Sequence, residues 1–375
     1  MHSGDPTVLA VDLGTESCRA QLITAETESS VPDPVPGSGP DWPSSVALEE
    51  QRLVVGNAAE RVGALYPTRY RNHIKQLLAT GLPASLAGNL YSAHELVAAL
   101  LTSIREQAEK NCGHRVTQAV LSVPGGGDAE DPRPSAIRKA AQAAGLDAVR
   151  VVLEPVAALD GIVESQQFNH GDIVVVCDFG AGAFQAHIVL CDHGVGWPEG
   201  HGRHHVLTGV ELPECGGVEL DHVIMQELAF RRGNPLSSLV KPAHLPGRRD
   251  RTQPALRSFQ AAAKDLKHQV VARGSGSFLL QPDQIRVEFT DEQLISAGAP
   301  LLHHAALATR ELLVGRGLSP SDVAGLLLIG GGARMPVIGP IFSQLIPRPF
   351  RMAADPDRTI LSGLVVAARQ WPARV

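Results

Sequence analysis

The sequence predicts an α/β protein built from two related lobes. Its 375 residues exceed what one hydrophobic core usually supports, and its 44% apolar and 19% charged residues are typical of a globular chain. Apolar strands alternate with helices in each half, which indicates a sheet covered by helices on its faces. A pattern of strand, glycine turn and strand also occurs twice, 166 positions apart.

The two copies of this hairpin pattern read TVLAVDLGTESCRAQLIT and VVVCDFGAGAFQAHIVL. When Asp12 is aligned with Asp178, Gly14 falls on Gly180 and a shared alanine follows at the same spacing. Any apolar strand that enters a glycine turn gives part of this pattern, so the hairpins alone leave a chance match open. Together with the rest of the chain, they favour an internal duplication.

The other elements follow from hydrophobic periodicity and from turn residues. Leu96, Leu100, Leu101 and Ile104 form one apolar face of a helix over residues 93–110. Residues 29–45 are rich in Pro, Ser and Gly, so we expect a connecting loop there. The remaining assignments are a strand at 117–124, a helix at 135–147 that Gly145 closes, a strand, turn and helix at 149–163, a helix at 258–272, a strand, glycine turn and helix at 326–346, and a helix at 359–370.

Charge, hydropathy and cysteine content disfavour nucleic acid and membrane partners and a disulfide framework. The net charge of -6 and the pI near 6.2 come without a basic stripe, so nucleic acid is not favoured. The first residues lack a basic and apolar leader, and no apolar run reaches membrane length, so we expect a cytoplasmic protein with no membrane contact. Five cysteines without paired spacing indicate reduced thiols.

An acid directly before a glycine turn would repel a phosphate unless a cation lay between them. Mg²⁺ keeps several waters and is held by one or two carboxylates, and Asp12 and Asp178 would supply two. The backbone N–H groups that would then bind phosphate oxygens belong to Gly14, Thr15, Gly180, Ala181 and Gly182. Each Asp can instead cap its own turn. Two such hairpins and the later GGGAR turn favour the metal and phosphate site.

The combined motifs resemble the nucleotide-binding domain of DnaK-type heat shock protein 70 chaperones over essentially the whole chain. They occur in the family's order: VDLGTESC, IKQLL, VLSVP, EPVAAL, CDFGAGAF, CGGVELD, IGGGARMP and DPDRTILSG. The resemblance implies a two-lobed actin-like ATPase (ribonuclease H-like) fold with a nucleotide cleft between the duplicated lobes. It places lobe I at 1–168 with a small subdomain at about 38–115, lobe II at 169–356 with one at about 218–300, and a C-terminal helix at 357–375 that returns toward lobe I.

The resemblance also implies roles for residues that match the family's motifs. Asp12 and Asp178 would hold hydrated Mg²⁺, and Lys75, Glu154 and Asp178 would act in catalysis on ATP. Lys75 taken alone is typical of an exposed helix lysine. The positions that match nucleotide-binding residues are Gly14, Thr15, Gly180, Ala181, Gly182, Gly216, Gly217, Lys264, Lys267, Gly330, Gly331, Gly332, Arg334, which would pack on adenine, and Asp357.

Several positions depart from the family's pattern. Ala183 takes the place of a family residue whose hydroxyl lies near the γ-phosphate. Gln185 takes the place of a family acid that binds a monovalent cation. Glu16 replaces the second threonine of the first turn, and Lys264 and Lys267 belong to an altered adenine-side helix. We therefore expect ATP binding with slow turnover or a changed base preference.

A second group of metal-capable residues is Cys191, His193, His201, His204, His205 and Cys215. Their spacing matches no compact structural zinc pattern, so a zinc site is not favoured.

The expected function is that of a stand-alone, chaperone-type ATPase domain that switches a separate partner protein with its nucleotide. DnaK-type chaperones continue into a peptide-binding domain, whereas this sequence stops after ARQWPARV, so we expect no client binding of that kind. Fold does not fix function, and three alternatives stay open. They are a nucleotide sensor with negligible hydrolysis, a small-molecule kinase or other ATP-using enzyme of the same superfold, and a filament-forming relative.

Overall fold

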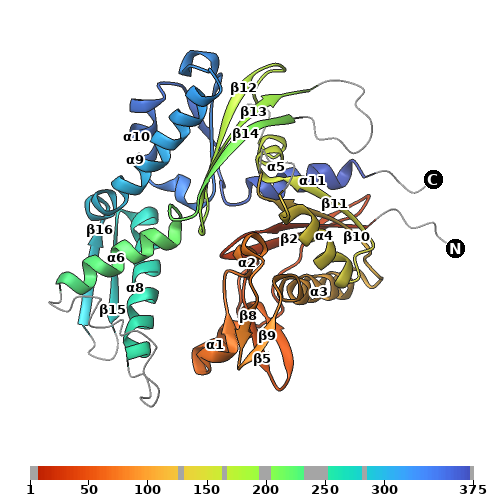
Figure 1. Cartoon of the computed structure of the whole chain (residues 1–375). Coiled ribbons are helices and arrows are strands. Elements are labelled where there is room, and N and C mark those ends of the chain that lie inside the picture. Colours follow the sequence, from red (N-terminus) through yellow and green to blue (C-terminus); the bar gives the residue numbers. More distant parts are fainter. Residues whose placement is uncertain are drawn as a thin grey trace.

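The chain forms two lobes, each built around its own sheet (Figure 1). The computed structural model describes residues 7–125, 131–162, 167–193, 204–231, 252–280 and 285–371. Strands and helices alternate along these ranges, which confirms the predicted α/β class. In the same ranges, no helix has both the length and the apolar character needed to cross a bilayer.

The sheet of lobe I has the strand order β11-β10-β1-β2-β3, with β4 paired to β2. Its strands are β1 (Val8–Leu13), β2 (Ser17–Ile23), β3 (Glu28–Ser30), β4 (Trp42–Pro43), β10 (Gln118–Val123) and β11 (Ala148–Leu153). The hairpin β1–β2 is antiparallel, whereas β10 runs parallel to β1 and β11 runs parallel to β10. The carboxyl ends of these parallel strands therefore meet at one edge of the sheet.

The sheet of lobe II repeats this topology in the order β18-β17-β12-β13-β14. Its strands are β12 (Ile173–Phe179), β13 (Phe184–Cys191), β14 (His204–Leu212), β17 (Gly325–Ile329) and β18 (Phe350–Met352). Here too an antiparallel hairpin is followed, on the side of its first strand, by two parallel strands. The repeated strand order supports the duplication that the two hairpins predicted.

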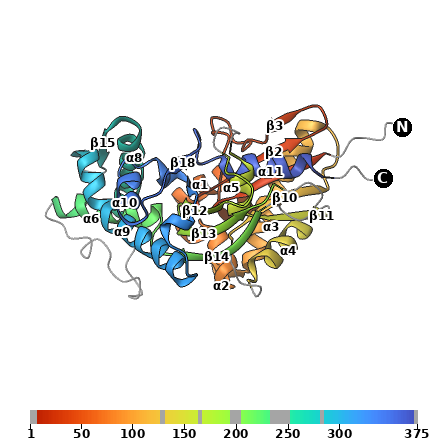
Figure 2. The ribbon, with the colours of Figure 1, turned by 90° about the horizontal axis from the view of Figure 1, so that it is seen from above.

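Each lobe carries further elements beyond its main sheet. In lobe I these are β5 (Val46–Glu49), β6 (Arg52–Val55), α1 (Gly56–Leu65), η1 (Pro67–Arg69), β7 (Tyr70–Arg71), α2 (Ile74–Thr80), β8 (Ala84–Leu86) and β9 (Asn89–Tyr91). In lobe II they are α6 (Gly217–Arg231), α8 (Thr252–Arg273), β15 (Ser275–Leu280), β16 (Ile285–Thr290) and α9 (Asp291–Gly315). Figure 2 shows α6, α8 and α9 at one end of the molecule and α3 (Ala93–Cys112), α4 (Arg133–Ala143) and β11 at the other. The exact domain bounds given above stay predictions.

The three largest hydrophobic cores of the described residues support this arrangement. The core of lobe I packs under α3 (Ala93–Cys112) and α4 (Arg133–Ala143), and that of lobe II packs under α9 and α10 (Ile338–Leu345). A third core joins the facing sides of the two sheets with α5 (Glu154–Asp160) and α11 (Thr359–Arg369). Helices α5 and α11 therefore lie between the lobes (Figure 1).

Close packing of α5 on α11 depends on two glycines. A Cβ added to Gly363 would lie 1.7 Å from the carbonyl oxygen of Ala157, and one added to Gly161 would lie 2.0 Å from the carbonyl oxygen of Thr359. Any larger side chain would push the helices apart. Helix α11 thus returns the end of the chain to lobe I, close to β1, β2 and β10.

The helix predicted at 93–110 is α3, and its ends follow the expected signals. Ser92 and Glu95 form a capping box at its start, and Gly113 ends it with a positive φ of 76°. The four apolar residues assigned to one face have no exposed surface, so they form part of the core of lobe I. Local periodicity and capping residues were therefore sufficient to predict this helix and its ends.

The loop predicted at 29–45 is only partly correct. Trp42 and Pro43 form the short strand β4, which pairs with Ser17 and Cys18 of β2. Trp42 is buried, and its indole N–H donates to the carbonyl of Val31 at 2.7 Å. A proline at a sheet edge removes no ladder hydrogen bond, so a segment rich in proline can still form an edge strand. Here the burial of Trp42 stabilises that strand.

Candidate nucleotide site

The two hairpins deliver one aspartate each to equivalent places. Asp12 pairs with Arg19 across β1–β2, and Asp178 pairs with Gln185 across β12–β13. Each acid is followed by one residue and then by the glycine turn, so both carboxylates stand at the end of a buried strand. Asp12 is 5% exposed, and its carboxylate accepts a hydrogen bond from the Ser122 hydroxyl at 3.0 Å.

Lys75 and Glu154 form a buried ion pair beside these acids. Lys75 belongs to α2 and Glu154 is the first residue of α5, and the Nζ to Oε1 distance is 2.5 Å. Burial alone would lower the pKa of Lys75, but Glu154, Asp12 and Asp178 together offset that effect and raise the pKa. Lys75 is thus not the exposed helix lysine that its local sequence suggested.

The carboxylates of this site carry more negative charge than the neighbouring cations neutralise. Burial and the nearby Glu154 raise the pKa of Asp12 to about 6 and that of Asp178 to about 7, although Lys75 acts to lower both. Asp178 keeps some exposed surface, so water and ligands can reach it. Buried acids with raised pKa values are a donor set that a divalent cation would neutralise.

The donor set fits a hydrated Mg²⁺ better than a fully protein-ligated ion. Among the described residues, no three Cys, His, Asp or Glu side chains converge as direct ligands of a metal. Magnesium asks for only one or two carboxylates and keeps its waters. Asp12 and Asp178 meet that requirement.

The glycine turns pack closely against one another and against Asp178. Gly330 has φ +80°, and a Cβ there would lie 2.4 Å from Asp178 Oδ1. A Cβ on Gly216 would lie 2.5 Å from the carbonyl oxygen of Ala181, and one on Gly182 would lie 2.6 Å from a methyl of Thr15. A side chain at Gly216 or Gly330 would therefore collide within lobe II, and one at Gly182 would displace the Thr15 side chain of lobe I.

Backbone hydrogen bonds fix the second hairpin turn to the start of α6. The N–H of Gly217 donates to the carbonyl of Gly180 at 3.0 Å, and the N–H of Val218 donates to Ala181 at 2.9 Å. The predicted turns at 180–182 and at 216–217 are thus held together.

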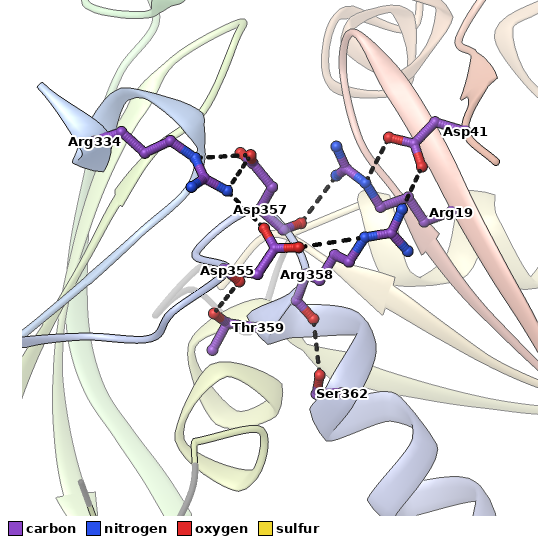
Figure 3. Close-up of polar contacts among 8 residues, drawn as sticks. All are labelled: Arg19, Asp41, Arg334, Asp355, Asp357, Arg358, Thr359 and Ser362. Atoms are coloured by element: carbon purple, nitrogen blue, oxygen red, sulfur yellow. Dashed lines mark hydrogen bonds and ion pairs between the residues drawn. The ribbon is translucent and has the colours of Figure 1, made fainter. Parts of the chain in front are cut away.

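The turn predicted to bind the nucleoside is the short helix η4 (Gly331–Arg334), which follows β17. The Arg334 guanidinium contacts Asp357 Oδ2 at 3.0 Å and Asp355 Oδ1 at 2.6 Å (Figure 3). A Cβ on Gly331 would lie 2.9 Å from Asp357 Oδ1. A Cβ on Gly332 would lie 2.8 Å from Phe179. The structure therefore brings Arg334 and Asp357 together beside the glycine turn.

The two lysines of α8 are both engaged by acids. Lys264 forms an ion pair with Glu16 of the first turn, and Glu16 also lies 3.1 Å from the His73 ring. The His73 hydrogen bond and the Lys264 charge lower the pKa of Glu16 to about 2. Lys267 donates to the carbonyl of Gly217 at 2.9 Å and lies 2.7 Å from Asp221. Glu16 thus joins lobe I to lobe II across the site.

The chain matches the family model for the Hsp70 protein over residues 72–370. It belongs to the Hsp70 family. The chaperone protein DnaK of Methanothermobacter thermautotrophicus (strain Delta H) is 25% identical over 367 residues, which cover 96% of this chain and 59% of that protein. This Hsp70 chain therefore has the two-lobed actin-like ATPase fold, and members of the family in general bind ATP or ADP with Mg²⁺.

Two of the departures of this Hsp70 chain lie in the second hairpin. Ala183 precedes β13 and brings no hydroxyl to the turn. Gln185 is 8% exposed, faces Asp178 and Glu211 in the ladder, and has a buried Oε1 with no hydrogen-bond partner in the described ranges. Gln185 therefore brings no charge to this side of the site.

Sequence reasoning missed several residues that hold the site. Gln76 Nε2 donates to the carbonyl of Gly182 at 3.3 Å, and the His187 ring contacts the carbonyl of Gly125. The Ser122 hydroxyl also accepts from the Leu13 N–H at 3.0 Å. The position of Ser122 at the end of a strand parallel to β1 was a usable signal, whereas the other contacts join segments distant in sequence.

Within the part of the chain that the structure describes, the histidines and cysteines of this group do not come together as three metal ligands. His204 opposes Cys191 in the β13–β14 ladder, and its Nδ1 accepts from the N–H of Asp192 at 3.2 Å while Nε2 lies 3.5 Å from Asp160. Both ring nitrogens of His204 therefore have protein partners. The Cys215 thiol contacts the carbonyl of Leu301, and His201 lies outside the described residues.

Proposed function

We propose that this chain binds ATP or ADP with Mg²⁺ between its hairpin turns, hydrolyses ATP slowly and acts as a nucleotide-gated switch for a separate protein partner. The observation that carries the proposal is the pair of turns that presents Asp12 and Asp178 beside the buried Lys75–Glu154 ion pair. A cytoplasmic location is part of the same proposal. The DnaK relative, named a chaperone protein, supports a role in chaperone action.

The residues of the site divide the chemistry between them. Asp12 and Asp178 would hold Mg²⁺ with its waters, and the cation would neutralise phosphate charge. The backbone N–H groups of the two turns bind phosphate oxygens. A terminal phosphate competes with Glu154 for the Lys75 ammonium, which frees the Glu154 carboxylate to accept a proton from the attacking water.

The switch part of the proposal rests on contacts that join the lobes. Besides the Glu16–Lys264 pair, Arg133 of α4 lies 2.7 Å from Glu211 of β14. A nucleotide between the turns contacts both lobes, so it favours the lobe arrangement in which these contacts and its own are made together. A partner protein that binds one arrangement better than the other would then respond to the nucleotide.

Thermal unfolding with and without nucleotide tests the proposal. With Mg²⁺ present, ATP or ADP at a hundredfold excess over Kd should stabilise the protein by about 2.7 kcal/mol. GTP serves as the base control, and chelation of Mg²⁺ should reduce the shift. The absence of a shift with every nucleotide would refute the proposal.

A nucleotide sensor without turnover is the second candidate, and Ala183 and Gln185 favour it. Charge aimed at the transition state is usually the largest catalytic contribution, and these two positions supply none. Release of inorganic phosphate by the purified protein without any partner separates the two functions. Nucleotide binding without measurable phosphate release would identify the sensor.

A further inference from the structure

Charged side chains from three distant segments form a continuous network beside the nucleoside turn (Figure 3). One segment is β2, the second is the stretch before β4, and the third precedes α11. Together with η4 they contribute Arg19, Asp41, Arg334, Asp355, Asp357 and Arg358. Three arginines face three aspartates, so the network is balanced in charge.

Asp41 is the centre of the part contributed by lobe I. Its Oδ2 accepts from Arg19 Nε at 2.8 Å, and its Oδ1 accepts from Arg358 Nη2 at 3.1 Å. Each carboxylate oxygen therefore serves a different guanidinium. Removal of the charge would leave two arginines facing each other without an acid between them.

The two arginines hold the segment of residues 355–358 in place. Arg19 Nη1 donates to the backbone carbonyl of Asp357 at 2.9 Å, and Arg358 Nε lies 3.4 Å from Asp355 Oδ2. The same aspartates bind Arg334 through their side chains. Asp41 thus acts on Arg334 through two layers of residues, the arginines that it contacts and the aspartates that those arginines hold.

We propose that Asp41, acting through Arg19 and Arg358, is a positioning residue for the nucleoside half of the site. It fixes the segment of residues 355–358 from lobe I, so that Asp355 and Asp357 hold the Arg334 guanidinium against the base. The inference rests on the proposed nucleotide binding. It adds a specific contact by which lobe I shapes the adenine side of lobe II.

A purely structural role for these ion pairs fits the molecule less well. Helix α11 is anchored by its own core residues, since Leu361 and Leu364 are 2% and 0% exposed. Asp41 and Arg358 keep about a third of their side-chain surface exposed, at 30% and 35%. Exposed pairs of this kind contribute little to global stability, so the main effect of Asp41 falls on local geometry.

The test measures ADP affinity by calorimetry, with Mg²⁺, for the wild type, Asp41→Asn and Arg358→Gln. Hydrogen bonds to charged groups fix Arg334 indirectly, so we expect each variant to bind ADP about tenfold more weakly. Asp147→Asn is the matched control, because Asp147 forms an exposed pair with Arg115 at 3.9 Å away from the network. Its ADP affinity should equal that of the wild type.

An Arg334→Ala background shows whether Asp41 acts through Arg334. In that background Asp41→Asn should cause no further loss of ADP affinity, whereas an equal further loss would overturn the inference. Unchanged affinity in both Asp41→Asn and Arg358→Gln would also overturn it while leaving nucleotide binding intact. A wild type that does not bind ADP would overturn the proposed function, and this inference with it. Far-UV circular dichroism confirms that each variant tested is folded.

Discussion

Replacement of Asp178 by asparagine should stabilise the protein without nucleotide at neutral and higher pH. The carboxyl of Asp178 has its pKa raised to about 7 by burial and by Glu154, from an ordinary value of 3.8. Between these values the folded state binds a proton that the unfolded state has lost, so the stability of the wild type falls as pH rises through this window. Asparagine has the same shape and no charge to bury.

The size of the effect follows from the two pKa values. An acid that ionises near pH 7 in the folded state and at 3.8 in the unfolded state costs folding up to about 4 kcal/mol once it is fully ionised. The remaining exposed surface of Asp178 keeps part of its hydration, so the observed cost should fall below that limit. The gain from Asp178→Asn should therefore be close to zero below pH 4 and reach about 2 to 4 kcal/mol above pH 8.

Urea unfolding at pH 4, 6 and 8, followed by far-UV circular dichroism, measures the gain. Asp147→Asn serves again as the control, because Asp147 is 65% exposed and its loss should not give this pH dependence. The difference in unfolding free energy between Asp178→Asn and the wild type should grow as pH rises. A difference that stays constant or shrinks would refute the idea that the Asp178 carboxylate is buried without a compensating charge. The same variant should also lose the thermal shift given by Mg²⁺ and ADP, since it lacks one of the two carboxylates for the cation.

Three further predictions concern turnover and release. Lys75→Ala should reduce ATP hydrolysis about 100-fold or more while ADP affinity changes little, because phosphoryl transfer depends on charge placed at the transition state. Phosphate release measures the hydrolysis rate and calorimetry measures the ADP affinity. Hydrolysis by Lys75→Ala at the wild-type rate would contradict the prediction. Ala183→Thr combined with Gln185→Asp should raise the basal rate and add dependence on potassium, whereas strong potassium stimulation of the wild type would show that the turn works differently. Glu16→Gln should speed ADP release several-fold in stopped flow by weakening the contact with Lys264, and an unchanged rate would remove that pair from the switch.

The sequence predicted those parts of the site that are local in the chain. The acid and glycine turn of each hairpin lie within three residues, and strand periodicity places both at the end of a buried strand. The GGGAR turn is equally local. Duplication of the hairpin then predicted that Asp12 and Asp178 occupy equivalent places, and the sheets repeat in that way.

Partners that join distant segments could not be predicted from periodicity. Lys75 and Glu154 are 79 positions apart, and nothing in the short helix α2 indicates that its lysine is buried. Asp41 and Arg358 are 317 positions apart, and Asp41 belongs to a segment whose composition indicated only a loop. Electrostatic partners of this kind depend on tertiary packing, which brings charges together regardless of local propensity.

Divergence at one duplicated position explains why the site is asymmetric in charge. Arg19 and Gln185 occupy equivalent places, each directly opposite the hairpin aspartate. In lobe I the arginine lowers the pKa of Asp12 and extends to the backbone of Asp357. In lobe II the neutral glutamine brings no such charge to Asp178, whose pKa is raised to about 7 by burial and by Glu154. The lobe II hairpin therefore lacks the cationic cross-strand neighbour that Asp12 has in lobe I, so a bound cation would add to Lys75 in offsetting the charge of Asp178.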